Sequence, residues 1–222
     1  MTRSFDETGL DRSLPHIGVI MEKTDTKSYP SFDLPAGFSF SLYQPGYEEE
    51  WASLQYTVGQ TDSLEEARGA FFSEFLQTEK DKMCRRMVFV LNPAGKVVGS
   101  AVLWAGSHFG REYQRVHWVA VNPEYQGLGI SKALVTWVLD LYNALGYDGY
   151  IYLTSQTWSY KALNVYSKFG FKPYLGAKPQ NWIAGDMTAD PFIPWDFETK
   201  NREAWKIIGE KIEEYEKRKK EG

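Results

Sequence analysis

The sequence predicts a mixed α+β fold, in which strands and helices follow one another along most of the chain. Three observations support this prediction. Short runs rich in β-branched and aromatic residues are separated by longer segments with apolar residues at helical spacing. Two of the β-rich runs flank an Asn/Pro/Gly loop at residues 92–95, which predicts a hairpin. A third run, residues 115–121, leads through a glycine-containing loop into an amphipathic helix.

Composition favours a globular chain with a large core. Of the 222 residues, 43% are hydrophobic and 16% aromatic, which is too apolar for a chain that is disordered throughout. The formal net charge of −4 argues against a protein that binds nucleic acid through bulk positive charge. The single cysteine, Cys84, excludes an internal disulfide and a multi-cysteine zinc site, and we expect no metal.

The chain shows no sign of a targeting or membrane segment. Its first seven residues lack the apolar stretch of a signal peptide. No apolar run approaches the roughly 18 residues that a membrane-spanning helix needs. We therefore expect a cytoplasmic protein with no membrane association.

The chain divides into three predicted regions. Residues 1–35 form an extension with one apolar run, 17–21, which we expect to be a strand paired with the main sheet. Residues 36–175 form the body. Residues 176–222 form a C-terminal segment, in which the apolar stripe of a helix at 198–219 must pack on the body or on a second subunit of a homodimer.

The body is predicted to be a succession of strands and helices. Its first half holds a strand, two helices and the two strands of the hairpin, at residues 37–43, 47–58, 64–77, 87–91 and 97–104. Its second half alternates strand and helix and ends in a strand, at residues 115–121, 130–145, 150–154, 159–169 and 171–174. Gly146 and Gly170 follow its two helices in the position of a C-cap.

The segment that points to chemistry is the loop Asn122-Pro-Glu-Tyr-Gln-Gly-Leu-Gly129, between a strand and a helix. Such a loop directs backbone N–H groups to one point at the positive end of the helix, and glycine lets a phosphate approach without a Cβ clash. It suits a pyrophosphate or a similar anion, although a tight strand–helix turn would use the same residues. Lys132 stands where a dinucleotide fingerprint needs a third glycine, and the Gly-Lys-Ser/Thr of a P-loop is absent.

Two motifs make the chain resemble the GNAT superfamily of acyl-CoA-dependent N-acyltransferases. The loop and helix start read Gln126-Gly-Leu-Gly129-Ile-Ser131, similar to the family's Gln/Arg-x-x-Gly-x-Gly/Ala. A later helix carries the residues of the second family signature, Ala162, Tyr166, Gly170 and Phe171. The resemblance covers roughly residues 37–175, and the runs at 117–121 and 152–162 look like a bacterial branch without a clear substrate.

The chain departs from the family pattern at two positions. Ser131 replaces the last Gly or Ala of the first motif and is small enough to leave the backbone cradle intact. Ser159 stands where the family often has an asparagine. That change weakens one contact to the pantetheine arm or the thiol region and leaves the resemblance standing.

The resemblance implies a fold and a cosubstrate site. The fold is a central mixed, mostly antiparallel sheet with a splayed strand pair and helices on both faces. The cosubstrate is acetyl-CoA, and the residues implied to bind it are Val119, Ala120, Val121, Gln126, Gly127, Leu128, Gly129, Ile130, Ser131, Lys132 and Ser159. Backbone N–H groups of residues 127–132 would take the pyrophosphate. The strand at 119–121 would pair with the pantetheine amides and polarise the thioester carbonyl.

The resemblance implies Tyr166 as the general acid that reprotonates the leaving thiolate; a core tyrosine on an amphipathic helix is the alternative. The acceptor also needs a base, because an amine is nucleophilic only when neutral. His117 lies two residues before Val119, and so on the same face of the strand, and imidazole titrates near neutral pH. A packed, hydrogen-bonded strand histidine is the alternative. Glu112 and His108 are weaker loop candidates, and a water relay needs no dedicated base.

The leading hypothesis is an N-acetyltransferase that moves acetyl from acetyl-CoA to a primary amine by direct attack in a ternary complex. A non-catalytic acyl-CoA-binding or regulatory module and a protein lysine or N-terminal acetyltransferase are the alternatives. Trp51, Trp104 and Trp118 suggest an enclosed pocket, which favours a small-molecule acceptor. The segment 47–81 carries nine acids and two bases, hence a net charge of −7, and so favours a cationic amine.

Overall fold

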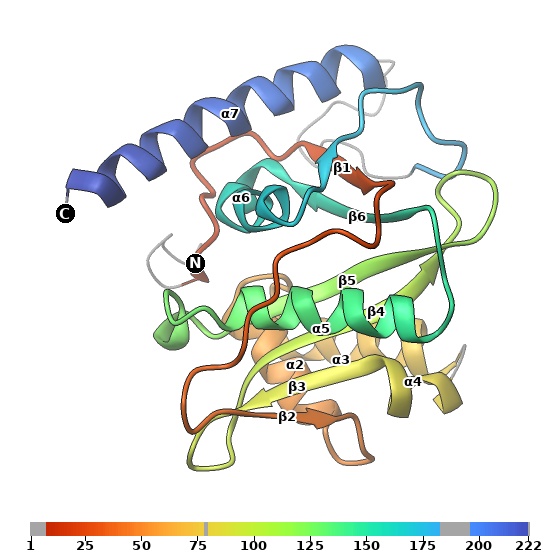
Figure 1. Cartoon of the computed structure of the whole chain (residues 1–222), viewed down its shortest axis with the longest axis vertical. Coiled ribbons are helices and arrows are strands. Elements are labelled where there is room, and N and C mark those ends of the chain that lie inside the picture. The colour runs from red at the N-terminus through yellow and green to blue at the C-terminus, as the bar shows by residue number, and fades with distance from the viewer. Residues whose placement is uncertain (1–7, 78–79, 183–195, 222) are drawn as a thin grey trace. The chain divides into compact units, whose positions relative to one another are not determined.

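The computed structural model describes residues 8–77, 80–182 and 196–221. Within them, seven strands form one sheet in the order β2-β3-β4-β5-β6-β1-β7 (Figure 1). The strands are β1 (Gly18–Lys23), β2 (Ser39–Leu42), β3 (Met87–Leu91), β4 (Val97–Gly106), β5 (Tyr113–Val121), β6 (Ile151–Gln156) and β7 (Lys172–Pro173). The β1–β6, β1–β7, β2–β3 and β3–β4 pairs are antiparallel, and β5–β6 is parallel. The mixed, mostly antiparallel sheet is confirmed, and so is the strand of the N-terminal extension.

The helices follow the predicted order with three differences. They are α2 (Glu48–Thr57), α3 (Leu64–Phe71), α4 (Lys80–Arg86), α5 (Ile130–Ala144), α6 (Tyr160–Lys168) and α7 (Phe197–Glu221), with the π-helix η1 (Phe72–Leu76) and the 3₁₀ turns η2 (Pro123–Tyr125) and η3 (Thr157–Ser159). The predicted helix 64–77 thus continues as a π-helix after α3, and the predicted helix 159–169 is preceded by a 3₁₀ turn. The helix α4 was not predicted, because its seven residues carry too few apolar side chains to form an apolar stripe.

The described residues form two compact units. Unit 1 takes in the described parts of Met1–Leu10, Pro30–Trp104 and Val116–Asp148, and unit 2 those of Asp11–Tyr29, Ala105–Arg115 and Gly149–Gly222. β4 and β5 each contribute residues to both units.

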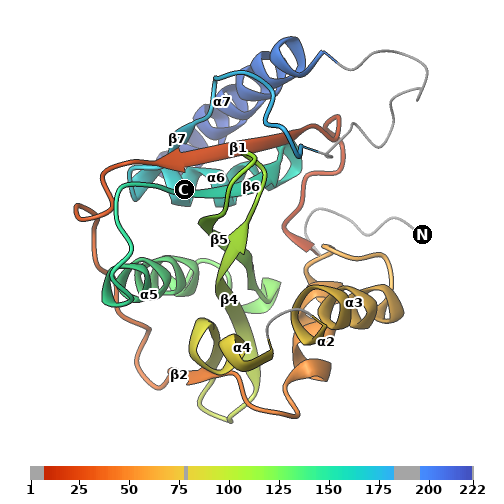
Figure 2. The ribbon, with the colours of Figure 1, turned by 90° about the vertical axis from the view of Figure 1, so that its right-hand side faces the viewer.

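An aromatic core fills one side of unit 1, where α2 and α3 lie across the strands from α5 (Figure 2). Trp51 of α2 contacts Phe71 and Phe75 edge to face, at centroid distances of 5.1 and 5.8 Å. Phe75 meets Trp104 of β4 at 5.0 Å. All four side chains are at most 5% exposed. The interpretation of Trp51 and Trp104 as walls of an acceptor pocket is therefore wrong, because both belong to the core.

On the other side of unit 1, α5 packs against β4 at Gly99. A Cβ at this position would lie 3.3 Å from side-chain carbons of Ile130 and Leu134 and from the Ala120 carbonyl oxygen. Glycine here lets the helix approach the strand closely. The first turn of α5 and the end of β5 both meet Gly99, so the loop that joins them is held at both ends.

In unit 2, β1 pairs with β6 over its whole length, and α7 packs on the same unit. Glu216 of α7 accepts hydrogen bonds from Asn164 at 2.5 Å and from Lys168 at 2.9 Å, both on α6. Asn201 donates to the Tyr174 carbonyl oxygen at 2.7 Å. Among the described residues, α7 thus contacts α6, η3 and β1. Packing of its apolar stripe on a second subunit stays a prediction.

No helix in the described ranges is both long and apolar enough to cross a bilayer. The N-terminal seven residues, considered above for a signal peptide, lie outside the described residues. So do residues 183–195 of the segment that precedes α7.

Candidate active site

The glycine loop lies in unit 1, between the end of β5 and the start of α5. Gly127 and Gly129 have φ angles of +83° and +90°, in the left-handed region that favours glycine. A Cβ on either residue would have no atom within 4 Å, so both glycines face open space. Gly129 is also the N-cap of α5. The loop therefore leaves bare, accessible backbone at a helix N-terminus.

The start of α5 suits an anion. Its first turn carries no acid, whereas α2 and α3 begin with three and two glutamates. The positive end of its macrodipole is thus not neutralised. The Lys132 ammonium lies 4.8 Å from the Phe32 ring centroid. The Lys132 N–H donates to the Gly129 carbonyl oxygen at 3.0 Å, so it is used within the helix and the predicted row of free N–H groups ends before it.

The residues implied to bind acetyl-CoA differ in how far they are exposed to solvent. Gln126, Gly127 and Leu128 are exposed, whereas Ala120 and Ile130 are buried in the core. The half-buried residues are Val119, Val121, Gly129, Ser131 and Lys132. A buried side chain cannot touch a ligand, so Ala120 and Ile130 can offer only their backbone groups.

Gln126 closes the loop back on the strand. Its side-chain amide donates to the Val121 carbonyl oxygen at 3.4 Å. A Cβ on Gly9 would lie 2.8 Å from the same amide nitrogen, so the N-terminal extension passes close by. The side chain of Gln126 therefore serves the conformation of the loop.

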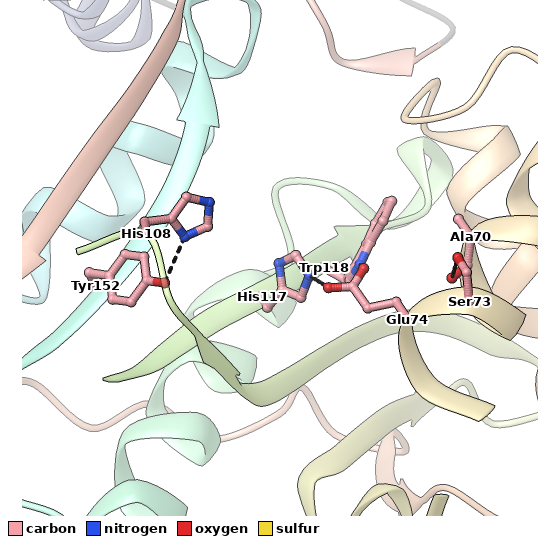
Figure 3. Close-up of polar contacts among 7 residues, drawn as sticks. All are labelled: Ala70, Ser73, Glu74, His108, His117, Trp118 and Tyr152. Atoms are coloured by element: carbon pink, nitrogen blue, oxygen red, sulfur yellow. Dashed lines mark hydrogen bonds and ion pairs between the residues drawn. The ribbon is translucent and has the colours of Figure 1, made fainter. Parts of the chain in front are cut away.

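His117 pairs with a glutamate that sequence reasoning missed. Its Nε2 lies 2.5 Å from Oε1 of Glu74, and the Trp118 indole N–H donates to Oε2 of Glu74 at 2.7 Å (Figure 3). The His117 and Glu74 side chains are 14% and 25% exposed, so the pair is shielded without being sealed from solvent. The arrangement joins a candidate base to a carboxylate that can orient it. Of the two alternatives for His117, the hydrogen-bonded strand histidine is thus observed, and it is compatible with a role as base.

The backbone of β5 is irregular at Trp118, whose φ is +47°. This conformation costs a bulky residue about 1–3 kcal/mol and persists only where the surroundings hold it. Trp118 is held by its hydrogen bond to Glu74 and by ring contact with Trp51 at 4.9 Å. The prediction that His117 and Val119 share a face assumes regular alternation of side chains along β5. The positive φ of Trp118 interrupts that alternation. The neighbours His117 and Trp118 both reach Glu74, and the shared face of His117 and Val119 stays a prediction.

Glu74 is presented by η1, the π-helical continuation of α3. A π-helix bonds each residue to the fifth along, which rotates side chains relative to an α-helix, and such turns are frequent at functional sites. Phe75 is fully buried in the aromatic core while its neighbour Glu74 reaches β5. A regular α-helix was expected here, so nothing in the pattern pointed to a glutamate beside His117.

The weaker base candidates lie in unit 2. His108 Nδ1 is 2.8 Å from the Tyr152 hydroxyl (Figure 3), and its ring contacts Trp182 at 5.8 Å. Burial raises the pKa of Tyr152, because a phenolate there would lose its hydration. His108 thus belongs to a packed aromatic cluster. Glu112 is exposed, as expected of a loop residue.

Tyr166 lies on α6 and Ser159 directly before it, both in unit 2. Tyr166 is 7% exposed, and its ring contacts Phe171 at 6.1 Å. Burial raises the pKa of the Tyr166 phenol above its usual value. Ser159 occupies the N-cap of α6 without a side-chain cap hydrogen bond.

Taken separately, each unit offers groups whose chemistry suits anion binding or proton transfer. Unit 1 provides bare loop backbone and a carboxylate–imidazole pair, and unit 2 provides a buried phenol. Among the residues that the structure describes, no cluster of three or more His, Cys, Asp or Glu side chains could hold a metal ion.

Comparison with protein families and curated proteins gives two matches. A family model described as Acetyltransferase (GNAT) family matches residues 41–171. A glucosamine 6-phosphate N-acetyltransferase of Trypanosoma brucei brucei is 33% identical over 90 residues, which cover 39% of this chain and 58% of the relative. The chain thus spans less than two thirds of that relative's length.

Comparison with solved structures finds the same fold. A GCN5-related N-acetyltransferase from Sphaerobacter thermophilus superposes with a TM-score of 0.55 at 21% identity, covering 72% of this chain and 49% of that one. A tandem GNAT protein from the clavulanic acid biosynthesis pathway superposes with a TM-score of 0.52 at 16% identity, covering 75% and 53%. At these identities the likeness concerns the fold alone.

Proposed function

Because the chain belongs to the GNAT family of acetyltransferases, we propose that it is an N-acetyltransferase, which moves the acetyl group of acetyl-CoA to a primary amine of a small molecule. The observation that carries this proposal is the glycine loop. Gly127 and Gly129 keep left-handed backbone beside open space, at the start of a helix whose first turn has no acid. Backbone N–H groups and the helix dipole both favour an anion there, so the loop fits the pyrophosphate of CoA.

The proposed roles of the side chains follow from the bonds that change. Acetyl-CoA, when bound, supplies an activated thioester, whose carbonyl carbon bonds to the amine nitrogen as the carbon–sulfur bond breaks. His117 takes the proton that the acceptor nitrogen loses. Tyr166 gives a proton to the departing sulfur. Backbone N–H groups of residues 119–121 hold and polarise the carbonyl oxygen.

The test is an acetyl-transfer assay with the purified chain. Release of free CoA thiol from acetyl-CoA is measured with glucosamine, glucosamine 6-phosphate, spermidine, glutamate or a lysine-containing peptide as acceptor, and products are identified by mass. Thiol release with acetylation of a small amine supports the proposal. Acetylation of the peptide alone favours the protein-acetyltransferase alternative. Acetyl-CoA binding without thiol release on any amine favours the binding module and overturns the proposal.

For the acceptor we propose an amino sugar or another small cationic amine. The curated relative is named for glucosamine 6-phosphate, an amino sugar. The net charge of −7 on segment 47–81 would attract a cation. Five of its nine acids occupy the first turns of α2 and α3, where they stabilise the helix N-termini, and Glu49 pairs with Arg68 at 2.8 Å. These roles are structural, but the charges still contribute to the field around the segment.

Glucosamine is expected to be a better acceptor than glucosamine 6-phosphate, because the two differ by a phosphate that the acidic segment repels. For glucosamine, kcat/KM should fall as ionic strength rises from about 0.01 to 0.15 M, because the Debye length shortens from about 30 to about 8 Å. Steady-state kinetics at one pH give kcat/KM for both sugars and its dependence on ionic strength. A clear preference for the phosphorylated sugar would contradict the electrostatic argument and leave acetyl transfer standing.

A further inference from the structure

We infer that Glu74 is a positioning residue, which holds His117 in the tautomer that can take a proton from the acceptor amine. The inference rests on the proposed function, in which His117 is the base. It adds a residue that neither family motif contains and that lies 43 positions before His117.

The Glu74 carboxylate bridges two aromatic side chains. Oε1 of Glu74 lies 2.5 Å from Nε2 of His117, and Oε2 accepts the indole N–H of Trp118 at 2.7 Å. Figure 3 shows the carboxylate between the two rings. Each oxygen is thus engaged by a different ring, so the carboxylate fixes the orientation of both rings.

The contact with Glu74 determines which ring nitrogen of His117 carries the hydrogen. An ionised carboxylate only accepts hydrogen bonds, so the nitrogen that faces it, Nε2, carries the hydrogen. In the neutral imidazole the lone pair then lies on Nδ1, which becomes the basic atom. The hydrogen bond to Glu74 also stabilises the imidazolium that forms when Nδ1 takes a proton. A carboxylate behind a histidine has this same double effect in catalytic triads.

The contacts of Glu74 involve two irregular backbone segments. Glu74 sits on the π-helix η1, and Trp118 has a positive φ within a strand. Two residues with uncommon backbone conformations, far apart in the chain, are thus joined by the Glu74 carboxylate. Strained conformations of this kind persist where surrounding contacts hold them and concentrate at functional sites.

Glu74→Gln gives a sharp test, because the Trp118 indole N–H can only donate. The glutamine carbonyl must therefore face Trp118, which turns its amide NH₂ towards Nε2 of His117. That nitrogen must now accept, so the hydrogen moves to Nδ1 and the base is lost. The expected result is a kcat lower by about 10²- to 10⁴-fold with little change in the acetyl-CoA KM. Glu49→Gln, which removes one exposed charge from the same acidic segment, should keep wild-type kcat.

The tautomer is read directly by long-range ¹H–¹⁵N NMR of histidine side chains, at the pH of the assay. The wild-type protein should carry the His117 hydrogen on Nε2, and Glu74→Gln should carry it on Nδ1. A hydrogen on Nδ1 in the wild-type protein, alone or together with Nε2, overturns the inference. This readout needs no turnover, so it separates failure of the inference from failure of the proposed function, which the amine panel decides.

A double variant tests the mechanism further. In Glu74→Gln/Trp118→Phe the indole donor is gone, so the glutamine amide can rotate and accept the Nε2 hydrogen again. Activity should then recover at least about 10-fold relative to Glu74→Gln, and the NMR pattern should return to that of the wild type. If Glu74 were only a packing residue, the second substitution would add to the damage. A double variant no more active than Glu74→Gln overturns the positioning role.

Discussion

Replacing Gly129 with valine is expected to weaken acetyl-CoA binding about 10- to 100-fold while the protein stays folded. At a φ of +90°, a β-branched residue is strained by about 1–3 kcal/mol. Relief of that strain rotates the backbone that presents N–H groups to the pyrophosphate, and each 1.4 kcal/mol lost is about a tenfold loss of affinity. The added Cβ meets no atom within 4 Å, so no clash opposes folding.

Gly146→Val is the matched control for this prediction. Gly146 follows the other end of α5, has a φ of +76°, and a Cβ added there would also have no atom within 4 Å. The two variants carry the same kind of strain, so their thermal unfolding midpoints should fall by similar amounts. Calorimetric titration should show a lower affinity for acetyl-CoA in Gly129→Val and an unchanged affinity in Gly146→Val. Unchanged affinity in folded Gly129→Val would remove the loop from the binding site.

The glycine loop could be predicted from sequence because everything that defines it is local. A strand, two glycines and an amphipathic helix follow one another within residues 115–145. Left-handed backbone at Gly127 and Gly129 follows from the residue type itself, because glycine has no Cβ. The strand in the N-terminal extension could also be predicted, since the apolar run at 17–21 is short and rich in β-branched residues, which favours a buried strand.

The pair formed by Glu74 and His117 could not be predicted, because it depends on two departures from regular geometry. An α-helical wheel through residues 64–77 assumes that no π-turn occurs, and period-two alternation through β5 assumes a negative φ at Trp118. Both assumptions fail at this site. Sequence periodicity predicts side-chain directions only where the backbone is regular. The contact between Glu74 and His117 is made where the backbone of both elements is irregular.

The place of the tryptophans could not be predicted either, for a different reason. Trp51 and Trp104 are large and amphipathic, and such residues line pockets as readily as they fill cores. Residue type alone does not separate the two cases. Their edge-to-face contacts with Phe71 and Phe75 place them in the core, and only the three-dimensional packing could decide this.

Replacing Tyr166 with phenylalanine is expected to lower kcat by about 10²- to 10⁴-fold, the usual range for general acid–base assistance. Only the hydroxyl oxygen is removed, and the ring keeps its contact with Phe171. α6 keeps its hydrogen bonds to Glu216 of α7. Acetyl-CoA affinity and the unfolding midpoint should therefore stay close to those of the wild type.

Tyr160→Phe is the matched control, because Tyr160 lies on the same helix and is also 7% exposed; it should keep wild-type kcat. The pH profile adds a second check. Burial raises the pKa of Tyr166, so its phenol stays protonated past the usual tyrosine pKa of about 10, and the wild-type rate should not fall through tyrosine ionisation below that pH. Single-turnover measurements isolate the chemical step. A wild-type single-turnover rate in Tyr166→Phe would make Tyr166 a core residue, since the hydroxyl would then contribute nothing to the breaking of the carbon–sulfur bond.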